Sequence, residues 1–305
     1  MYPFPGVIGK YFTALTRIAV PVFFMITGYF YFDVEEKNGE TRQIKKIFKL
    51  VLEANVLYLL WDSFYAVLSR NMSFLLDTFT IENVLKFIAF NESPLKGHLW
   101  YLGAILYVLI IMHIFDKLKI EKMSLFLRHR FLLMGDLILG KYSVLLLGRE
   151  FPYILVRNFL FVGIPYFCIG RLIRNGFGQK VKKKVLTIFL IVFSATSLLE
   201  RFALVSLNVN SARDHYISTT LLAITVFLFT LQCHGSNKTL ALIGRKYSTW
   251  LYILHPIFIT CIGMVAHKVG VYGIYKFIAP IVVYITTLIF LMIVDKIKMA
   301  AVIDR

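Results

Sequence analysis

The sequence has few of the features that mark soluble enzymes and secreted domains. Its 305 residues include only three cysteines and 17 acidic side chains, against 34 basic ones. Cys168, Cys233 and Cys261 lie inside or at the edges of apolar segments, which indicates packing residues and not a disulfide framework. Long polar stretches are also scarce, because 58% of the residues are hydrophobic and the mean hydropathy is +0.72. Soluble domains are about 45–50% apolar, so this composition argues against a soluble domain.

Several catalytic and binding motifs are also absent from the sequence. It contains no P-loop and no glycine-rich dinucleotide fingerprint. It has no His-Glu-x-x-His or paired-cysteine pattern for a metal ion, no Gly-x-Ser-x-Gly nucleophile motif, and no His-x-x-x-x-Asp pattern of glycerolipid acyltransferases. We therefore expect no metal site, and the common nucleotide-binding and serine-hydrolase classes are disfavoured.

Apolar runs of membrane-spanning length recur along the whole chain. We count about nine helix candidates, each near the roughly 20 residues that a bilayer requires. Asp136 interrupts the fourth of them, which makes it the weakest, and Ile81–Phe90 is a shorter amphipathic helix suited to an interface. The composition predicts an all-α, polytopic transmembrane helix bundle that forms a single domain over residues 1–305. The nine candidates cover residues 15–32, 47–68, 99–115, 123–139, 158–173, 185–205, 216–233, 250–266 and 275–295.

The net charge of +17 is concentrated in alternate loops between the apolar segments. This alternation is typical of the positive-inside bias and explains the charge better than nucleic-acid binding does. It places the basic loops and the C-terminus in the cytoplasm and the N-terminus outside the cell membrane. An outside N-terminus suggests that a full-length relative carries one more helix ahead of this chain, and a genuine nine-helix protein is the alternative.

Arg17 opens a segment that is otherwise apolar and aromatic, from Thr16 to Phe30. Placing a guanidinium in the lipid core of a bilayer costs about 3 kcal/mol on insertion scales. Two interpretations remain open. Arg17 either extends to the membrane interface along its own stem, or it faces a polar cavity.

Basic residues form one helical face after the first segment. Arg42, Lys45, Lys46 and Lys49 have the i, i+3, i+4 and i+7 spacing that aligns side chains on a helix. One interpretation is an interfacial anchor. The other is a clamp for the phosphates of a nucleotide cofactor such as coenzyme A, because arginine and lysine on one face suit phosphate groups. Glu53 follows this face and can balance its charge.

A histidine and two aromatic residues begin the third segment, in the run His98-Leu-Trp100-Tyr101. Trp100 and Tyr101 are either aromatic-belt residues or the lining of a polar site. A histidine titrates near neutral pH and can therefore accept or donate a proton. We take His98 as a candidate catalytic residue beside them.

Tyr252 and His255 share a helical face, and Pro256 follows directly. Proline removes a helix hydrogen bond, so it loosens the backbone beside this histidine. A histidine inside a membrane helix is either a functional residue or a structural, hydrogen-bonded one. His215 falls in a loop and has no further interpretation from the sequence.

These motifs together resemble the acyltransferase family 3 group of bacterial integral membrane proteins, and within it the membrane portion of vancomycin-resistance serine racemases. Each motif is weak alone, but five occur in register over essentially the whole chain. They are the run Arg17–Tyr29, the pattern Arg42-x-x-Lys45, His98-Leu-Trp-Tyr, Pro165–Arg171 and Trp250–Pro256.

The resemblance implies a bundle with one membrane helix more than the nine found here. It implies transfer of an acyl group, usually acetyl, from cytoplasmic acyl-CoA to a hydroxyl of an extracytoplasmic glycan or another cell-envelope acceptor. The family's catalytic histidine lies on the first helix, which is missing here, so His98 and His255 remain as candidates. Arg17 would stabilise developing negative charge, the basic face would hold the donor, and Glu53, Trp100, Tyr101 and Tyr252 would line the site. The second basic position is Lys45 where the family has arginine.

Two alternatives to an acyltransferase remain open. A transporter-like membrane module, for example for L-serine, would use the same polar residues without covalent chemistry. A truncated, inactive relative would keep the fold and lack activity. The cytoplasmic basic face favours the acyltransferase, because a serine carrier has no need of a phosphate clamp.

Overall fold

The computed structural model describes residues 5–71, 73–118, 122–207, 215–233, 235 and 237–303. These residues form helices and connecting turns, and no β-strand occurs among them. The all-α fold expected from the sequence is confirmed. The chain divides into two compact units, one from Ala14 to Gln232 and a smaller one built from residues up to Thr13 and from Cys233 onward.

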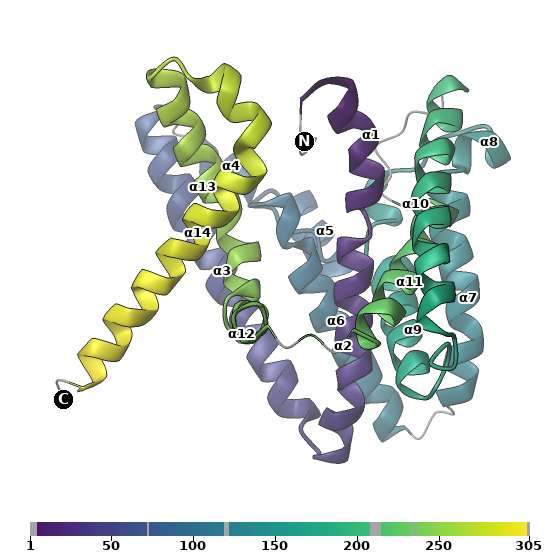
Figure 1. Ribbon diagram of the computed structural model, residues 1–305. Helices are drawn as coiled ribbons and strands as arrows, with labels where there is room; N and C mark the ends of the chain where they lie inside the picture. Colours follow the sequence, from purple (N-terminus) through teal and green to yellow (C-terminus); the bar gives the residue numbers. More distant parts are fainter. Residues whose placement is uncertain are drawn as a thin grey trace. The chain divides into compact units, whose positions relative to one another are not determined.

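Each of the expected apolar segments is helical, and the amphipathic Ile81–Phe90 is a helix with those same bounds (Figure 1). The sequence reading missed the short helices α1, α4, α8 and α12. The α-helices are α1 Gly6–Thr16, α2 Ala19–Glu36, α3 Glu40–Leu68, α4 Phe74–Thr78, α5 Ile81–Phe90, α6 Trp100–Lys117, α7 Lys122–Leu139, α8 Ser143–Leu147, α9 Ile164–Arg174, α10 Lys183–Ser206, α11 Ile217–Leu231, α12 Lys238–Lys246, α13 Ser248–Lys268 and α14 Tyr272–Ile303. Two 3-10 turns, η1 Gly97–Leu99 and η2 Tyr153–Leu155, and one π-helical turn, η3 Phe159–Gly163, complete them.

Among the described residues, six helical stretches are long and apolar enough to cross a membrane. They cover Tyr11–Glu36, Glu40–Leu68, Gly97–Lys117, Lys183–Ser206, Ser248–Lys268 and Tyr272–Ile297, and the shorter Ile217–Leu231 is also apolar. The outer face of α3 leaves large side chains open, with Leu60 65% and Phe64 59% exposed. Such a face is unfavourable in water and is what lipid-contacting helices carry. The chain is therefore a multi-pass membrane protein.

The larger unit is organised by the crossing of α2 and α9, at which two glycines face each other. A Cβ on Gly28 would lie 2.0 Å from the Phe167 carbonyl oxygen, and one on Gly170 would lie 2.1 Å from that of Met25. No side chain fits at either position. Membrane helices that cross at small residues bring their backbones into contact and gain packing that lipid cannot supply.

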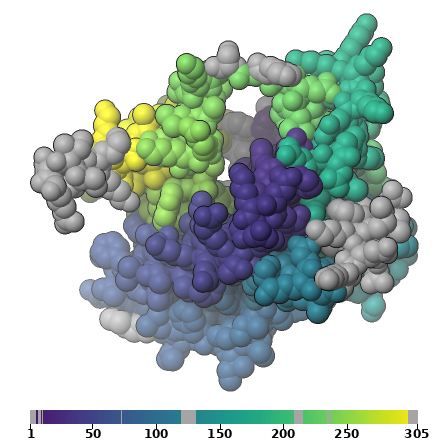
Figure 2. All heavy atoms as spheres, turned by 90° about the horizontal axis from the view of Figure 1, so that it is seen from below, coloured from purple at the N-terminus to yellow at the C-terminus, as the bar shows by residue number. Residues whose placement is uncertain are grey.

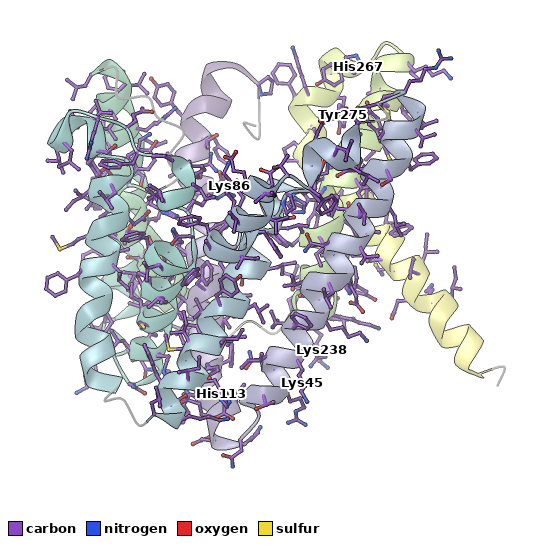
Figure 3. All side chains as sticks on the ribbon, turned by 180° about the vertical axis from the view of Figure 1, so that it is seen from behind. Lys45, Lys86, His113, Lys238, His267 and Tyr275 are labelled. Carbon is purple, nitrogen blue, oxygen red and sulfur yellow. The ribbon has the colours of Figure 1, made fainter. Side chains whose placement is uncertain are left out.

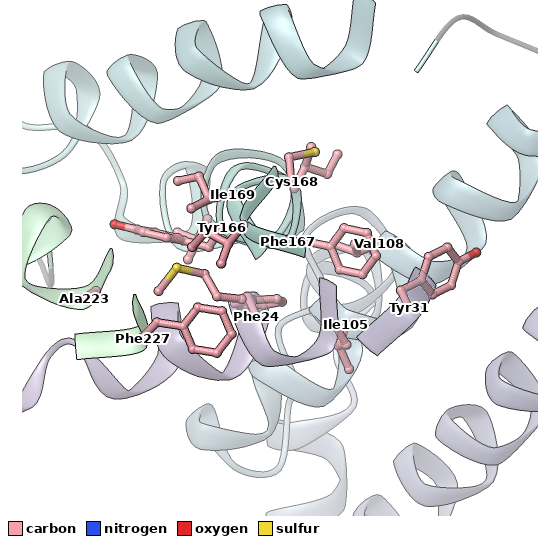
Figure 4. Packing of buried hydrophobic residues seen from close by; sticks show 14 of the residues in the cluster. Phe24, Tyr31, Ile105, Val108, Tyr166, Phe167, Cys168, Ile169, Ala223 and Phe227 are labelled. Atoms are coloured by element: carbon pink, nitrogen blue, oxygen red, sulfur yellow. The ribbon is translucent and has the colours of Figure 1, made fainter. Parts of the chain in front are cut away.

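The core of this unit lies around the crossing (Figure 4). Phe24 and Phe167 are fully buried, and Val108 of α6 and Phe227 of α11 pack into the same cluster. Figure 4 shows Tyr166, Phe167, Cys168 and Ile169, which occupy about one turn of α9, pointing in different directions from this helix. A helix that is apolar on all sides is buried on all sides, which explains why α9 needs no lipid-facing stripe.

Two ion pairs tie α2 and α9 together at one end of the crossing. The Arg171 guanidinium donates to both carboxylate oxygens of Glu35, at 2.6 and 2.8 Å, and Arg174 donates to Asp33 at 2.6 Å. Bidentate pairs of this kind combine strength with a fixed geometry. A hydrogen bond that Arg174 donates to the Tyr29 hydroxyl, together with the nearby Asp33 carboxylate, raises the pKa of Arg174 above its usual value.

The smaller unit is built around the antiparallel helices α13 and α14. Ala266, Tyr275 and Val283 form its buried cluster. Lys246 and Tyr247 both donate hydrogen bonds to Asp295 of α14, which fixes the start of α13 against that helix. The bond from Lys246 neutralises a carboxylate near the end of a membrane span, where an unpaired charge is costly.

The glycine crossing predicts opposite effects for alanine at two kinds of site. Gly28→Ala and Gly170→Ala should each lower the unfolding free energy by about 1–3 kcal/mol or more, because the new Cβ overlaps a backbone carbonyl. Gly263→Ala in α13 is the matched control. The nearest atom to its Cβ, in Tyr275, is 3.9 Å away, so alanine should stabilise that helix by about 0.5–1 kcal/mol.

Thermal unfolding of the purified variants in detergent, followed by the tryptophan fluorescence, distinguishes the two cases. Equal effects at the three glycines would contradict the backbone contact between α2 and α9.

Candidate functional site

A small polar cavity lies at the end of the larger unit opposite the α2–α3 turn. Its volume is about 10 Å³, close to the space that holds one water molecule. Lys141 lies two residues before α8, which Figure 1 shows at the upper end of the unit, whereas the α2–α3 turn lies at the lower end. The cavity is lined by Asp136, Gly140, Lys141, Tyr153, Val156, Arg157 and His215.

The centre of the cavity is a buried pair of a histidine and a carboxylate. His215 Nδ1 lies 2.8 Å from Asp136 Oδ2, and their side chains are only 7% and 3% exposed. Asp136 sits in the last turn of α7, and His215 precedes α11 by two residues. A carboxylate that contacts Nδ1 orients the imidazole and stabilises its protonated form. This is the arrangement by which histidines act as bases in nucleophilic catalysis.

Two cations and several aromatic rings surround this pair. Lys141 is 1% exposed, and its Nζ lies 5.0 Å from the centre of the Tyr216 ring. The Arg157 guanidinium lies 4.7 Å from the Trp100 ring and 5.3 Å from the Tyr153 ring. Cation–π contacts of this kind hold a charge in place with little water. The side chains that line the cavity therefore include one carboxylate and two fixed cations besides the histidine.

The polar cluster continues from the cavity along the start of α11. Arg201 donates a 3.1 Å hydrogen bond to the Tyr216 hydroxyl, and Glu200 accepts hydrogen bonds from the backbone and side chain of Ser218. Arg17, half-buried between α1 and α2, lies near enough for its charge to act on Tyr216. Arg17 thus joins the polar cluster at this end of the unit.

The basic face of α3 lies at the other end of the unit and is open to solvent. Arg42, Lys45, Lys46 and Lys49 are all exposed, and Lys49 Nζ lies 3.7 Å from Glu53 Oε1. Figure 2 looks onto this end, where the purple atoms of the α2–α3 turn lie at the surface, and Figure 3 shows Lys45 there with His113. These cations occupy the first turns of a helix, whose N-terminal end already favours anions.

His98 and Tyr101 have aromatic neighbours in the larger unit. The His98 ring packs edge-on against Tyr58, with centroids 5.2 Å apart. Tyr101 packs against Phe24 at 4.8 Å and so belongs to the core around the crossing. Trp100 is buried, and its ring contacts the guanidinium of Arg157, which lines the cavity. The structure therefore joins Trp100 to the polar cavity and gives His98 and Tyr101 packing contacts.

His255 belongs to the smaller unit, and its side chain replaces the backbone hydrogen-bond donor that Pro256 lacks. Proline has no N–H, so the Tyr252 carbonyl four residues earlier loses its usual helix partner. The His255 side chain donates from Nδ1 to that carbonyl at 2.8 Å. The Tyr252 and His255 rings lie 6.2 Å apart. This contact gives His255 a local structural role inside α13.

Sequence reasoning missed the central pair of the cavity. The one available signal was Asp136, which interrupts an apolar segment. Burying a carboxylate in a membrane protein is costly unless another polar or charged group pairs with it. His215, Lys141 and Arg157 come from three different loops, and nothing in their local sequence brings them together. Only the packing of α7 and η3 against α9 and α6 does so.

Comparison with known proteins identifies a family and one curated relative. The model of the acyltransferase 3 family, described as an acyltransferase domain, matches residues 1–294. A serine/alanine racemase from Enterococcus gallinarum is 25% identical over 269 residues, which are 84% of this chain and 37% of that protein. The chain therefore spans little more than a third of this relative. No solved structure matches the chain.

The histidine–proline pair in α13 predicts a coupled effect on stability. His255→Ala should cost about 1 kcal/mol of unfolding free energy, because it leaves the Tyr252 carbonyl without its side-chain donor. Pro256→Ala restores a backbone N–H at the right place, so the same histidine change should cost much less in that background. Unfolding of the four proteins in detergent measures the coupling.

His113→Ala, made in both backgrounds, is the control and should cost the same in each. An equal cost of His255→Ala with and without Pro256 would show that the hydrogen bond to Tyr252 is not what this histidine contributes.

Proposed function

The chain belongs to the acyltransferase 3 family, and from this premise we propose that it moves an acyl group from a coenzyme A thioester to a hydroxyl group across the membrane. The family and the membrane spans make it a membrane acyltransferase. The proposal adds that the donor is cytoplasmic acyl-CoA, that the acyl group is acetyl, and that the acceptor is an extracytoplasmic glycan or another cell-envelope molecule. The family match over residues 1–294 is the observation that carries it.

The donor side of the proposal rests on the basic face of α3. Coenzyme A carries several phosphate charges, which cannot enter a bilayer without a very large desolvation cost. They must remain at the membrane surface and need cations there. Arg42, Lys45, Lys46 and Lys49 supply these cations from one exposed face at the start of a membrane span. With this assignment the α2–α3 turn is cytoplasmic, and the alternation of basic loops would add the C-terminus on the same side and the start of the chain outside.

The acceptor side of the proposal rests on the polar cavity at the opposite end. The two ends are joined by α2, whose 18 residues span about 27 Å at the usual helix rise. A hydroxyl acceptor needs hydrogen-bonding groups and a base, and the cavity holds both. In the transfer, the acceptor oxygen bonds to the thioester carbonyl carbon, the carbon–sulfur bond breaks, and the hydroxyl proton finally resides on the released thiol.

One observation favours a second candidate function. Asp136 lines the cavity together with Lys141 and Arg157, and charges of both signs complement the ammonium and carboxylate groups of an amino acid that approaches the cavity from outside, since about 10 Å³ does not admit the whole molecule. The relative's name, serine/alanine racemase, agrees with such a ligand. A membrane module that binds or carries serine would need the cavity and would have no use for the cations of α3.

Removal of donor-binding cations tests the acyltransferase. The full chain, purified in detergent, is mixed with acetyl-CoA labelled in the acetyl group and with a cell-wall glycan preparation, and thiol release and labelled product are followed. In the double variant Arg42→Ala/Lys45→Ala, loss of two charge-assisted contacts should raise the donor KM by about tenfold or more. The kcat should change little, since binding that is equal in ground and transition states affects KM alone.

Lys180→Ala/Lys184→Ala is the matched control, because it removes two exposed cations of the same basic side outside α3. Its donor KM should stay within about twofold of the parent. Absence of donor binding and thiol release in the parent protein would refute the acyltransferase, and uptake of labelled serine by proteoliposomes would then establish the second candidate.

A further inference from the structure

We propose that the polar cavity of the larger unit binds a single monatomic anion, a halide such as chloride. The inference goes beyond the proposed acyl transfer and does not depend on it, because the ion is a ligand of the cavity wall and takes no part in a chemical step. It rests on the charges that line the cavity, on the burial of those charges and on the volume between them.

Positive charge exceeds negative charge on the wall of the cavity. Among the lining residues that the structure describes, Lys141 and Arg157 are cations and Asp136 is the one carboxylate. Asp136 Oδ2 also lies 2.8 Å from Nδ1 of His215. When His215 is neutral the two cations face one negative charge, and when it is protonated the surplus is larger. The wall therefore attracts an anion in either state of the histidine.

The two cations have limited contact with water. Lys141 is 1% exposed, and its Nζ lies 5.0 Å from the centre of the Tyr216 ring. Arg157 is half-buried, and its guanidinium lies 4.7 Å from the ring of the buried Trp100. Removing a charge from water is costly, and the face of an aromatic ring offsets only part of that cost. An anion between the two cations offsets more of it.

A different solution holds the buried arginine at the other end of the unit. Arg171 makes a bidentate contact with Glu35, at 2.6 and 2.8 Å, so a carboxylate of the protein neutralises it. The carboxylate of the cavity is instead bonded to a histidine, and two cations line the same space. The charges of the cavity therefore accommodate one further negative charge from a ligand.

The volume of the cavity selects a monatomic anion. About 10 Å³ is close to the space that one water molecule occupies, and chloride is only slightly larger than water. Sulfate, phosphate and acetate have several heavy atoms and do not fit. The Lys141 ammonium and the Arg157 guanidinium provide N–H donors, which match a halide because it only accepts hydrogen bonds. The same volume excludes an acceptor molecule for the acyl group, which must bind outside the cavity.

The bound ion joins parts of the chain that are distant in sequence. Lys141 lies after α7, Arg157 lies before η3, and His215 lies before α11. An anion among these side chains reduces the repulsion between their charges, and it does so only in the folded state. A ligand that binds the folded state alone stabilises it, increasingly so as the ligand concentration rises above its dissociation constant.

Equilibrium dialysis of the full chain, purified in detergent, against radioactive chloride tests the proposal directly. In a gluconate buffer of constant ionic strength, binding should saturate at one ion per chain. Unlabelled bromide should displace the chloride, whereas sulfate and acetate should not. The temperature of thermal unfolding should rise as chloride replaces gluconate, because the ion binds the folded state.

Variants of two arginines test the position of the ion. Arg157→Gln should raise the chloride dissociation constant about tenfold or more, because a charge-assisted contact is lost, and Arg157→Lys should retain most of the affinity. Arg149→Gln is the matched control. The Arg149 guanidinium lies 4.7 Å from the Phe151 ring, the same distance as Arg157 from Trp100, but Arg149 is exposed and does not line the cavity. Its chloride affinity should equal that of the parent.

The parent protein alone can overturn the proposal. Absence of saturable chloride binding would mean that the cavity holds water only, and displacement by sulfate or acetate would mean that the ion lies in a larger site. Equal affinities of Arg157→Gln and Arg149→Gln would place the ion outside the cavity. Size-exclusion elution identifies a variant that fails to fold, and Arg157→Lys then replaces Arg157→Gln, with a smaller loss of affinity expected. Donor and acceptor are absent from these measurements, so their outcome is separate from that of the acyltransferase test.

Discussion

The contact between the backbones of α2 and α9 is the constraint on which the larger unit depends. Gly28 and Gly170 each meet a carbonyl of the other helix at a distance that admits no side chain. In a bilayer, helices gain nothing from leaving water, so association depends on this kind of close packing. The crossing brings Arg171 and Arg174 to the carboxylates at the end of α2. It also orients α9, against which α7 and η3 pack to form the wall of the polar cavity.

Local pattern predicted much of this architecture. Every apolar segment longer than a few turns is a helix, and the amphipathic Ile81–Phe90 is a helix of those bounds, because hydrophobic periodicity and length determine helices in membranes. The short helix α8 escaped prediction, since its five residues are too few for periodicity to show. The hydrogen bond between His255 and the Tyr252 carbonyl was predictable, because the position of Pro256 determines which carbonyl lacks a backbone donor.

The central residues of the candidate site were not accessible in the same way. Asp136 stood out as a charge within an apolar segment, but its partner lies 79 positions further along the chain. No local rule connects a residue of α7 to the residue that precedes α11. Lys141 and Arg157 looked like ordinary loop charges, and their burial is a consequence of the crossing and of the aromatic rings that receive them. Sites built from loops depend on tertiary packing that a single sequence does not display.

The two ends of the unit use charge differently, and this difference separates stability from chemistry. Near the α2–α3 turn, Arg171 and Arg174 each pair with a carboxylate of α2 at 2.6 Å, while the cations of the α3 face are exposed. The cavity wall carries Lys141, Arg157 and His215 with Asp136 as its one carboxylate. Fixed cations in a site with little water stabilise a group that becomes negative more than one that is neutral. The charges of the cavity therefore suit an anionic group, whereas the pairs of Arg171 and Arg174 hold α2 and α9 together.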